Sequence, residues 1–488
     1  MTFPHCLARW LVPVTHGPIV AAGAVAAVTV LAGAAGSLAV TPPHAADCGA
    51  TGSGTCYYVD AAAGDDASRG TSAQPFRSVQ QAASVVGPGD VVIVRNGVYT
   101  GTSKAILSIG RGGTALHYAT FKADHRWGAI LDGRDNTSAD GIRISASFVR
   151  VEGFEIKGVW HDAISPASGV ANFEIAGNHI HDVGRHCETR SLGLSAIGVA
   201  NDNVVIEGNL IHDIGRYGPG EKGCMPLNAY WQNHDHGVYL ESGSNVVIRN
   251  NVFYNMVHGW SVHRYSGHGG NVDGLSIVNN TFCCGNPSKA GEIIIANDLS
   301  HAVIANNIFY QPTTAGIWFD GGTMSQVTVA NNLTSNGPVS GGSRPGVTFS
   351  ANLDRADPLF VNPAGFDFHL EAGSPAINAG LRLAIVPKDF DGNARPQGAG
   401  WDIGAFEWKP ATRETPPDRS GPGRQRDLSA LVSTSRAPSI HSPTAGQGSR
   451  ESHTSSRVPG GWRPNSSRRP WVTDGYVPGY PAGRPARM

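Results

Sequence analysis

The sequence of 488 residues lacks several features that mark common protein classes. No Cys-x-x-Cys pair is present, and this absence argues against a zinc site built from thiolates. Lysine is scarce, with seven lysines against thirty arginines. This bias, with abundant alanine and glycine, fits a GC-rich bacterial genome.

The chain contains a short sequence motif that is repeated seven times between Phe148 and Leu333. Each copy alternates apolar and polar residues over four to six positions and is rich in Val and Ile, which is strand periodicity. A recurring period of roughly 20 to 50 residues indicates a solenoid or a similar array. The strands begin at Phe148, Phe173, Val204, Val246, Leu275, Val303 and Val327.

Six of the copies end in an asparagine, which tolerates left-handed backbone and suits a sharp bend between strands. Stacked asparagines can also bond to one another along the axis. The pattern predicts an all-β fold, a right-handed parallel β-helix, because parallel crossovers are overwhelmingly right-handed. A β-propeller is the alternative, but its blades need more regular lengths than these. The asparagines are Asn178, Asn209, Asn251, Asn280, Asn307 and Asn332.

The two ends of the chain differ from the repeats. Residues 1–46 resemble a secretory signal with cleavage near Ala45, although their apolar stretch is long enough to be an uncleaved anchor. Residues 409–488 are rich in Pro, Ser, Gly and Arg, carry a net charge of +8, and are predicted to be disordered. We expect a monomer that is either secreted or held at the cell surface and that contacts a membrane only through an uncleaved leader. We expect no specific nucleic-acid partner.

Six cysteines remain after the leader, as an oxidising compartment would allow. Cys48 and Cys56 bracket a small loop and could close on each other. Cys187 and Cys224 lie in two long insertions and could clamp neighbouring coils. The adjacent pair Cys283–Cys284 has no clear partner.

The body of the chain, 47–408, opens with Tyr57–Asp60, a helical segment at 78–86 and a strand at 90–94. The helix is predicted to cap the open end of the stack. This opening resembles secreted right-handed β-helix proteins of the pectate-lyase-like superfamily. Segments 374–380, 389–396 and 401–407 are similar to the C-terminal closing element of bacterial surface proteins. The resemblance implies the fold; it does not select a reaction, because this fold hosts lyases, hydrolases, epimerases and adhesins.

A candidate site follows from aligning a second strand in each coil. Matching Gly237–Glu241 with Gly259–His263 places His236 beside His258 and Glu241 beside His263. A lyase acting on a uronate needs a group that neutralises the carboxylate, a base and an acid. The predicted catalytic residues are His236, Tyr239, Glu241, His258, His263 and Arg264, and the predicted substrate-binding residues are Tyr265, His268, Trp318, Asp320 and Arg143.

Other chemistry fits parts of this pattern. Gly267–Gly269 matches the Gly-His-Gly of pectin hydrolases, but the Asp-rich motifs that accompany it in those enzymes do not appear upstream. Glu241 with Asp235 or Asp320 could still form an acid and base pair. Calcium is a possible cofactor, although the calcium-binding Asp cluster and catalytic Lys of some pectate lyases have no clear match. A transition metal at His234, Asp235 and His236 is a weaker possibility.

We interpret His181 and His212 as packing residues, because they share a repeat position with Tyr254 and Tyr310. The favoured function is a carbohydrate-active enzyme that acts on an acidic polysaccharide by β-elimination or epimerisation. A glycan-binding or adhesin-like solenoid without chemistry is the second hypothesis, and a glycoside hydrolase is the third.

Overall fold

The computed structural model describes residues 48, 54–187, 193–218, 220–225, 233–256, 258–287 and 289–409. The predicted leader lies outside these residues, as does the predicted tail after its first residue, so both stay predictions. No helix among the described residues is long and apolar enough to cross a membrane.

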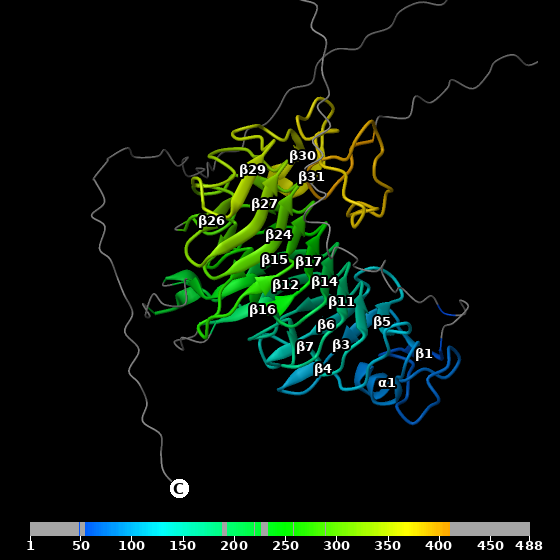
Figure 1. Cartoon of the computed structure of the whole chain (residues 1–488). Helices are drawn as coiled ribbons and strands as arrows, with labels where there is room; N and C mark the ends of the chain where they lie inside the picture. The colour runs from blue at the N-terminus through cyan, green and yellow to red at the C-terminus, as the bar shows by residue number, and fades with distance from the viewer. Residues whose placement is uncertain are drawn as a thin grey trace, which may run out of the picture. The chain divides into compact units, whose positions relative to one another are not determined.

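Parallel strands stack coil upon coil, and successive coils give strands to three faces (Figure 1). We call these the long face, the site face and the back face. The long face contains β1 (Cys56–Val59), β2 (Val91–Val94), β5 (Ala119–Ala123), β8 (Val149–Glu152), β11 (Phe173–Ala176), β14 (Val204–Glu207), β17 (Val246–Arg249), β21 (Ser276–Val278), β24 (Leu299–Ala305), β27 (Met324–Ala330) and β29 (Val347–Ser350).

The site face and the back face follow the same plan. The site face contains β4 (Ala105–Ile109), β7 (Asp140–Ile144), β10 (Ile164–Pro166), β13 (Leu194–Ala200), β16 (Asp235–Ser244), β19 (Val262–Arg264), β23 (Ile293–Ile295) and β26 (Ile317–Phe319). The back face contains β3 (Gly97–Tyr99), β6 (Ala129–Asp132), β9 (Glu155–Lys157), β12 (His179–Val183), β15 (Leu210–Ile214), β18 (Val252–Tyr254), β22 (Thr281–Cys283), β25 (Ile308–Tyr310) and β28 (Leu333–Thr334). The predicted parallel β-helix is therefore confirmed.

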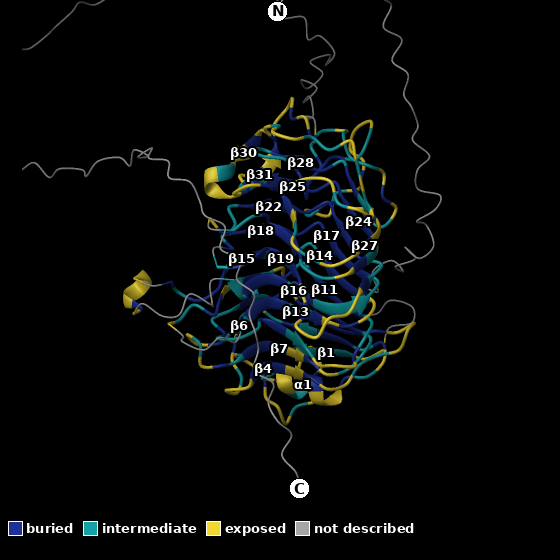
Figure 2. Ribbon diagram, turned by 60° about the vertical axis from the view of Figure 1, so that its left-hand side comes forward, coloured by how far each residue is buried: buried dark blue, intermediate teal, exposed yellow. Residues whose placement is uncertain are grey.

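The core runs along the axis of the stack, because alternate residues of each strand point inward (Figure 2). Phe253, Phe282 and Phe309 occupy equivalent inward positions in successive coils, and their rings stack at 5.0 and 5.2 Å. Each buried aromatic or branched side chain contributes about 1.5–3 kcal/mol. The stack therefore gains stability coil by coil.

The repeated asparagines form the predicted ladder. Asn251 Nδ2 donates to Asn280 Oδ1 at 3.0 Å, and Asn251 Oδ1 accepts from Asn209 Nδ2 at 2.9 Å. The same bonds run from Asn178 to Asn352, and all but the last of these side chains are fully buried. Each side chain thus satisfies polar groups at a corner that water cannot reach.

The residue before each of the six repeated asparagines has a different structural role. It adopts a left-handed backbone at Gly177, Gly208, Asn250, Asn279, Asn306 and Asn331. The four asparagines of this set hold the C-terminal segment; Asn306 Nδ2, for example, donates to the Leu381 carbonyl at 2.8 Å. The two glycines belong to earlier coils. In each repeated Asn-Asn pair, the second asparagine therefore bonds to its equivalents along the axis, and the first bonds outward to the C-terminal segment.

The N-terminal end of the described stack is covered by a helix. Helix α1 (Val79–Val85) begins after Ser78, whose hydroxyl accepts the Gln81 N–H at 3.1 Å, and its buried residues pack on the first coils. This confirms the predicted capping helix. After the last coils, β30 (Phe360–Asn362) and β31 (Asp367–Leu370) form an antiparallel pair that packs on back-face residues such as Ile308 and Leu333.

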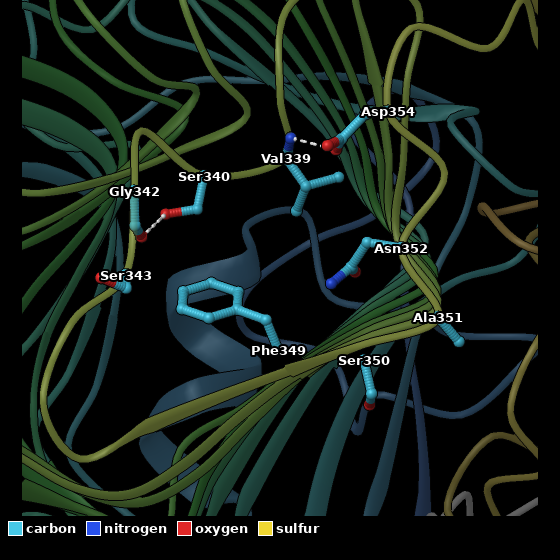
Figure 3. A pocket seen from close by; sticks show the side chains of 9 residues that line it. All are labelled: Val339, Ser340, Gly342, Ser343, Phe349, Ser350, Ala351, Asn352 and Asp354. Carbon is cyan, nitrogen blue, oxygen red and sulfur yellow. Dashed lines mark hydrogen bonds between the residues drawn. The ribbon is translucent and has the colours of Figure 1, made fainter. Parts of the chain in front are cut away.

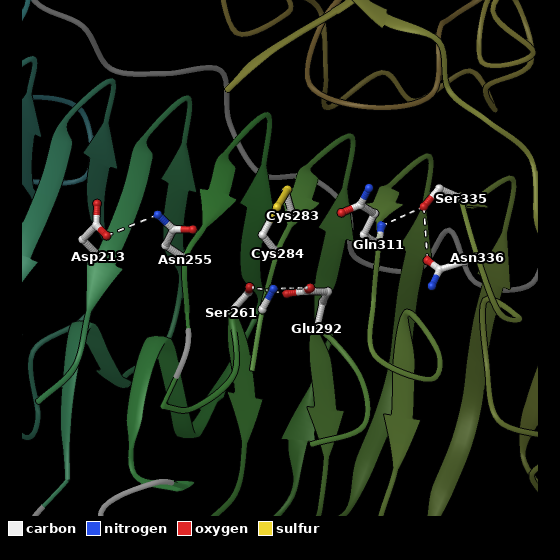
Figure 4. Close-up of a disulfide and its surroundings, with 10 residues drawn as sticks. Asp213, Asn255, Ser261, Cys283, Cys284, Glu292, Gln311, Ser335 and Asn336 are labelled. Carbon is white, nitrogen blue, oxygen red and sulfur yellow. Dashed lines mark hydrogen bonds between the residues drawn. A yellow bond between two sulfur atoms is a disulfide. The ribbon is translucent and has the colours of Figure 1, made fainter. Parts of the chain in front are cut away.

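Three disulfides join the cysteines. Cys48 bonds Cys56 and Cys187 bonds Cys224, the two pairings that the sequence suggested. Cys283 and Cys284, for which the sequence suggested no partner, bond each other at the end of β22 (Figure 4).

Candidate functional site

The register of the site face differs from the predicted one by two residues. Tyr239 on β16 lies opposite His263 on β19, so His236 comes level with Trp260 and not with His258. A shift of two keeps every side chain on its predicted side of the strand. The predicted neighbours were therefore wrong, whereas the predicted outward positions hold.

The side chains of His236 and His263 are hydrogen-bonded to each other. His236 Nε2 lies 2.9 Å from His263 Nδ1, and the backbone N–H of Trp260 donates to His236 Nδ1 at 3.2 Å. Because Nδ1 of His236 accepts, the hydrogen of this ring is on Nε2 and is donated to His263. In turn, His263 carries its own hydrogen on Nε2.

Both imidazoles are neutral at physiological pH. Burial lowers the pKa of His263 to about 3, helped by the positive potential of His234 and Arg264. Burial also lowers the pKa of His236 well below its usual value. A buried neutral imidazole can donate a hydrogen bond to a developing anion without first losing a charge.

Aromatic rings surround this pair. The Tyr239 ring lies 5.5 Å from both imidazoles, nearly parallel to His236 and edge-on to His263. Trp260 lies 4.9 Å from His263, and Tyr265, which is 40% exposed, stacks on His263 at 5.5 Å. We call His236, Tyr239, Trp260, His263 and Tyr265 the imidazole cluster. Trp260 was not among the predicted site residues.

Arg264 does not share this surface. Its guanidinium is fully buried and donates to the backbone carbonyls of Glu241, Gly270 and Asp298. As the neighbour of His263 on a strand, it points to the other side. The predicted role of Arg264 as the partner of a substrate carboxylate is therefore wrong, and Arg264 holds the turns beside the site.

Glu241 lies at a β-bulge. Leu240 pairs with Val199 and Ser242 pairs with Ala200, so Glu241 is the extra residue between them. Bulges redirect a side chain at the edge of a regular ladder. The predicted pairing of Glu241 with His263 is wrong, because the register places Tyr239 opposite His263.

The residues around His258 form a separate ion-pair group. His258 Nε2 lies 3.3 Å from Glu221 Oε2, and Asp235 is locked by Arg216, with Nη2 to Oδ1 at 2.6 Å. Asp235 is fully buried, so it cannot act with Glu241 as the predicted acid and base pair. Arg216 holds Asp235, and both His236 nitrogens have protein partners, so the transition metal predicted at His234, Asp235 and His236 gains no support from this arrangement and stays a prediction.

The predicted substrate-binding residues spread along the face. Trp318 on β26 is 37% exposed, and its Nε1 donates to Asp320 Oδ1 at 3.3 Å. In the register, Trp318 lies opposite Ile294, which lies opposite His263. His268 is exposed in the turn after β19. Trp318 therefore lies two coils from His263, on the same outward row.

Carboxylates lie on the other side of the imidazole cluster. Asp140, His161 and Asp162 bring their ligand atoms within 4.8 Å of one another. His161 Nδ1 is 3.1 Å from Asp140 Oδ1, and Arg143 Nε is 3.3 Å from Asp140 Oδ2. We call Asp140, His161 and Asp162 the acidic cluster. The sequence showed Asp140 on the outward row but gave no reason to group it with the other two.

Burial and charge shift the pKa values in the acidic cluster. Burial raises the pKa of Asp162 to about 6, against the opposing effects of His161 and of Ser195, whose N–H and hydroxyl both donate to Asp162 Oδ1. Burial alone would lower the pKa of His161, but Asp140 and Asp162 outweigh it and raise that pKa. Two carboxylates and an imidazole are ligands that calcium or a transition metal can use.

A continuous polar row joins the two clusters. In the register, Asp162 lies opposite Ser195, and Ser195 lies opposite His236. Beside this row stands Gly198, where an added Cβ would be 3.7 Å from Asp162 Oδ2 and Ser195 Oγ. Gly198 lies opposite Tyr239, so a residue without a side chain separates the carboxylates from the phenol.

A shallow hollow lies elsewhere, near the last coils. It is lined by Val339, Ser340, Gly342, Ser343, Phe349, Ser350, Ala351, Asn352 and Asp354 (Figure 3). The Asp354 carboxylate accepts the Val339 N–H at 2.8 Å. None of the predicted site residues lines this hollow, and its side chains supply no acid and base pair.

Comparison with known proteins agrees with this geometry. The family model described as "Pel9A-like, right handed beta helix region" matches residues 57–281, and the model "Right handed beta helix region" matches residues 227–353. The chain is a right-handed β-helix protein. The first match contains both the imidazole cluster and the acidic cluster. No curated protein sequence matches the chain.

Several solved structures resemble this β-helix protein. Pectate lyase Pel9A shares 14% identity over 73% of this chain and 96% of its own, with a TM-score of 0.43. A rhamnogalacturonan lyase shares 16% over 62% of this chain and 86% of its own, with a TM-score of 0.35. An alginate lyase from Paenibacillus sp. shares 16% over 58% and 86%, with a TM-score of 0.34. At this level of similarity no activity follows from any of them.

Proposed function

We propose that the chain is a secreted carbohydrate-active enzyme that cleaves a uronate-containing polysaccharide by β-elimination on the site face. The observation that carries this proposal is the neutral, bonded pair His236–His263 beside the Tyr239 phenol, one polar row away from buried carboxylates. The Pel9A-like family match over this region supports it.

In this mechanism, His263 takes the role that the sequence suggested for Arg264. Its Nε2–H donates to the uronate carboxylate and stabilises the charge that develops when the neighbouring carbon loses its proton. His236 fixes this tautomer through its own hydrogen bond. The Tyr239 hydroxyl gives its proton to the leaving oxygen while its oxygen takes the proton from the carbon, so the phenol is restored at the end of the step.

The acidic cluster supplies a second means of holding the substrate. Asp140 and Asp162 fit a hard divalent cation such as calcium, which when bound would draw the uronate carboxylate toward the site face. Arg143, about half exposed and already paired with Asp140, lies at the edge of this cluster. Trp318 and Tyr265 offer exposed ring faces to sugars.

The test is the ultraviolet absorbance of unsaturated uronate when the purified chain meets pectate, alginate or a glycosaminoglycan, with and without calcium. We expect a rise in absorbance that Tyr239→Phe removes, because the phenyl ring keeps the packing and loses only the hydroxyl. His125→Gln, at a largely exposed imidazole, is the control and should retain the rise. Absence of a rise with every substrate contradicts the lyase proposal.

A second candidate is a glycan-binding solenoid without chemistry. Its support is the internal bonding of the imidazole pair and the withdrawal of Arg264 from the surface. Binding of an acidic polysaccharide without new double bonds, new reducing ends or a change in uronate stereochemistry would favour this function.

A further inference from the structure

Three histidines converge on the back face, away from both clusters of the site face. His179 and His181 lie two residues apart on β12, so both imidazoles project from the same side of the strand. His212 on β15 lies opposite His181 in the next coil. One ring nitrogen from each of the three comes within 4.8 Å of the others.

Two of these imidazoles are oriented by carboxylates. His181 Nδ1 lies 2.7 Å from Asp182 Oδ2, and His212 Nδ1 lies 2.6 Å from Asp213 Oδ2. Asp182 and Asp213 both have left-handed backbone, with φ of 51° and 52°, which turns each carboxylate back to the histidine before it. A carboxylate on Nδ1 keeps the hydrogen there, and on His212 this leaves the Nε2 lone pair for a ligand bond. His181 Nε2 already faces Glu155 Oε1 at 3.3 Å, so a hydrogen that it donates to Glu155 must leave when a metal binds.

The third imidazole meets this lone pair directly. His179 Nε2 lies 2.7 Å from His212 Nε2. Because His212 carries its hydrogen on Nδ1, His179 is the donor in this contact. A cation that replaces this hydrogen would bind both nitrogens after a tautomer exchange in His179. Tetrahedral zinc, with Zn–N near 2.0–2.1 Å, needs the two atoms to separate only to about 3.4 Å.

Surrounding rings hold the three imidazoles in place. Trp127 packs on His179 at 4.9 Å, and Tyr254 stacks on His212 at 4.3 Å. His181 and His212 stack on each other at 5.1 Å, with an angle of 7° between their planes. These contacts keep the three ring nitrogens close together, but a nitrogen lone pair lies in the plane of its ring, so one of the two parallel rings must rotate before both can bind the same metal.

We propose that His179, His181 and His212 form a binding site for a divalent transition-metal ion such as zinc. Glu155 is the fourth ligand, because its Oε1 already lies 3.3 Å from His181 Nε2. Lys157 Nζ holds this carboxylate at 2.8 Å and is displaced from it on binding. Asp182, Asp213 and Glu155 outnumber Lys157 in the immediate surroundings, so the local charge favours a cation.

The packing role that the sequence suggested for His181 and His212 is confirmed, because their rings stack in one column with Tyr254, and the proposed site adds to it. The proposed site also differs from the acidic cluster in chemistry. Three imidazoles suit zinc and other borderline metals, whereas Asp140 and Asp162 suit calcium. The proposal does not depend on the lyase activity, because the two faces use different residues.

The experiment is a titration of the chelator-treated full chain with ZnCl2 in competition with a chromophoric chelator. We expect one zinc equivalent in the wild-type chain whose affinity falls at least 100-fold in His212→Gln and in His179→Gln. His301→Gln, at an exposed histidine that also pairs with an aspartate, is the matched control and should keep the wild-type affinity. His161→Gln should keep it too, and this separates the site from the acidic cluster.

A second variant keeps the test independent of folding. Asp213→Asn retains all three imidazoles and removes only the charge that orients His212, so zinc affinity should fall about 10- to 100-fold. Cobalt bound to the wild-type chain should show the intense visible bands of tetrahedral coordination. Equal zinc affinity in the wild type and in His212→Gln, or no zinc binding to the wild type, overturns the proposal.

Discussion

The site face and the back face use histidine in opposite ways, although both place imidazoles on neighbouring coils of one stack. On the site face, His236 and His263 are hydrogen-bonded to each other, and His236 also accepts a hydrogen bond from the backbone N–H of Trp260. On the back face, Asp182 and Asp213 bind the Nδ1 atoms of His181 and His212, and one nitrogen of each ring lies within 4.8 Å of the others and of a His179 nitrogen. The partner of the second nitrogen distinguishes a hydrogen-bond donor from a metal ligand.

This difference shows that a cluster of histidines has no fixed chemistry. The fold supplies only the spacing of about 4.8 Å between coils. The neighbouring residue, which is an aspartate after His181 and His212 and an arginine after His263, fixes the tautomer or the charge around it. Exchanging the properties of the two faces is therefore a direct test of both assignments.

The largest effect is expected when each face loses one imidazole. His263→Gln should lower the rate of uronate elimination at least about 100-fold, which is in the range for a group that acts only in the transition state. His212→Gln should leave this rate within about twofold. The measurement is the initial rise in ultraviolet absorbance at equal protein concentration. Equal losses in both variants would show that neither histidine acts locally.

Stabilisation of the folded chain by zinc should depend on His212 of the back face and not on His263 of the site face. A ligand that binds only the folded chain adds about 2.7 kcal/mol at 100 times its dissociation constant, so zinc should raise the midpoint of thermal unfolding. The rise should persist in His263→Gln and vanish in His212→Gln. Thermal unfolding followed by circular dichroism, with and without ZnCl2, measures both. A rise that survives in His212→Gln would place the metal elsewhere.

Acid should weaken the folded chain through His263. Its pKa is about 3 in the folded state and about 6.5 in the unfolded state, so between these values only the unfolded chain takes up this proton. Stability should therefore fall as the pH drops from 6.5 toward 3, by up to about 1.4 kcal/mol per pH unit for this group. His263→Gln should flatten the dependence of the unfolding free energy on pH. An unchanged slope would mean that His263 is protonated in the folded chain.

Most of the fold could be predicted from the sequence because the repeats that determine it are local. Strand alternation and the asparagines of the ladder, such as Asn251, carry their structural reason within a few residues. The second role of the Asn-Asn pair was not visible, since Asn306 meets the Leu381 carbonyl 75 residues away. The disulfide between Cys283 and Cys284 was missed for another reason, because a bond between adjacent cysteines needs an unusual turn.

The candidate site was predicted less well because register depends on loop length. Taking 22 residues as one coil put Glu241 beside His263, whereas the true spacing of 24 puts Tyr239 there. Alternation survived this error, so the outward side of Tyr239 and His263 was right. Arg264 is buried against backbone carbonyls that include those of Glu241 and Asp298, and Asp235 pairs with Arg216, 19 residues away; no local pattern reveals these contacts.

The smallest change in zinc affinity is expected from removing the basic side chain that pairs with a carboxylate on each face. Arg143 pairs with Asp140 on the site face, and Lys157 pairs with Glu155 on the back face. Partly exposed ion pairs contribute about 0.2–1 kcal/mol, so Lys157→Ala should release Glu155 and raise zinc affinity about two- to fivefold. Arg143→Ala, the matched change on the other face, should leave zinc affinity unaltered. A loss of zinc affinity in Lys157→Ala would mean that Glu155 is not the fourth ligand, because freeing its carboxylate can only help a metal that it binds.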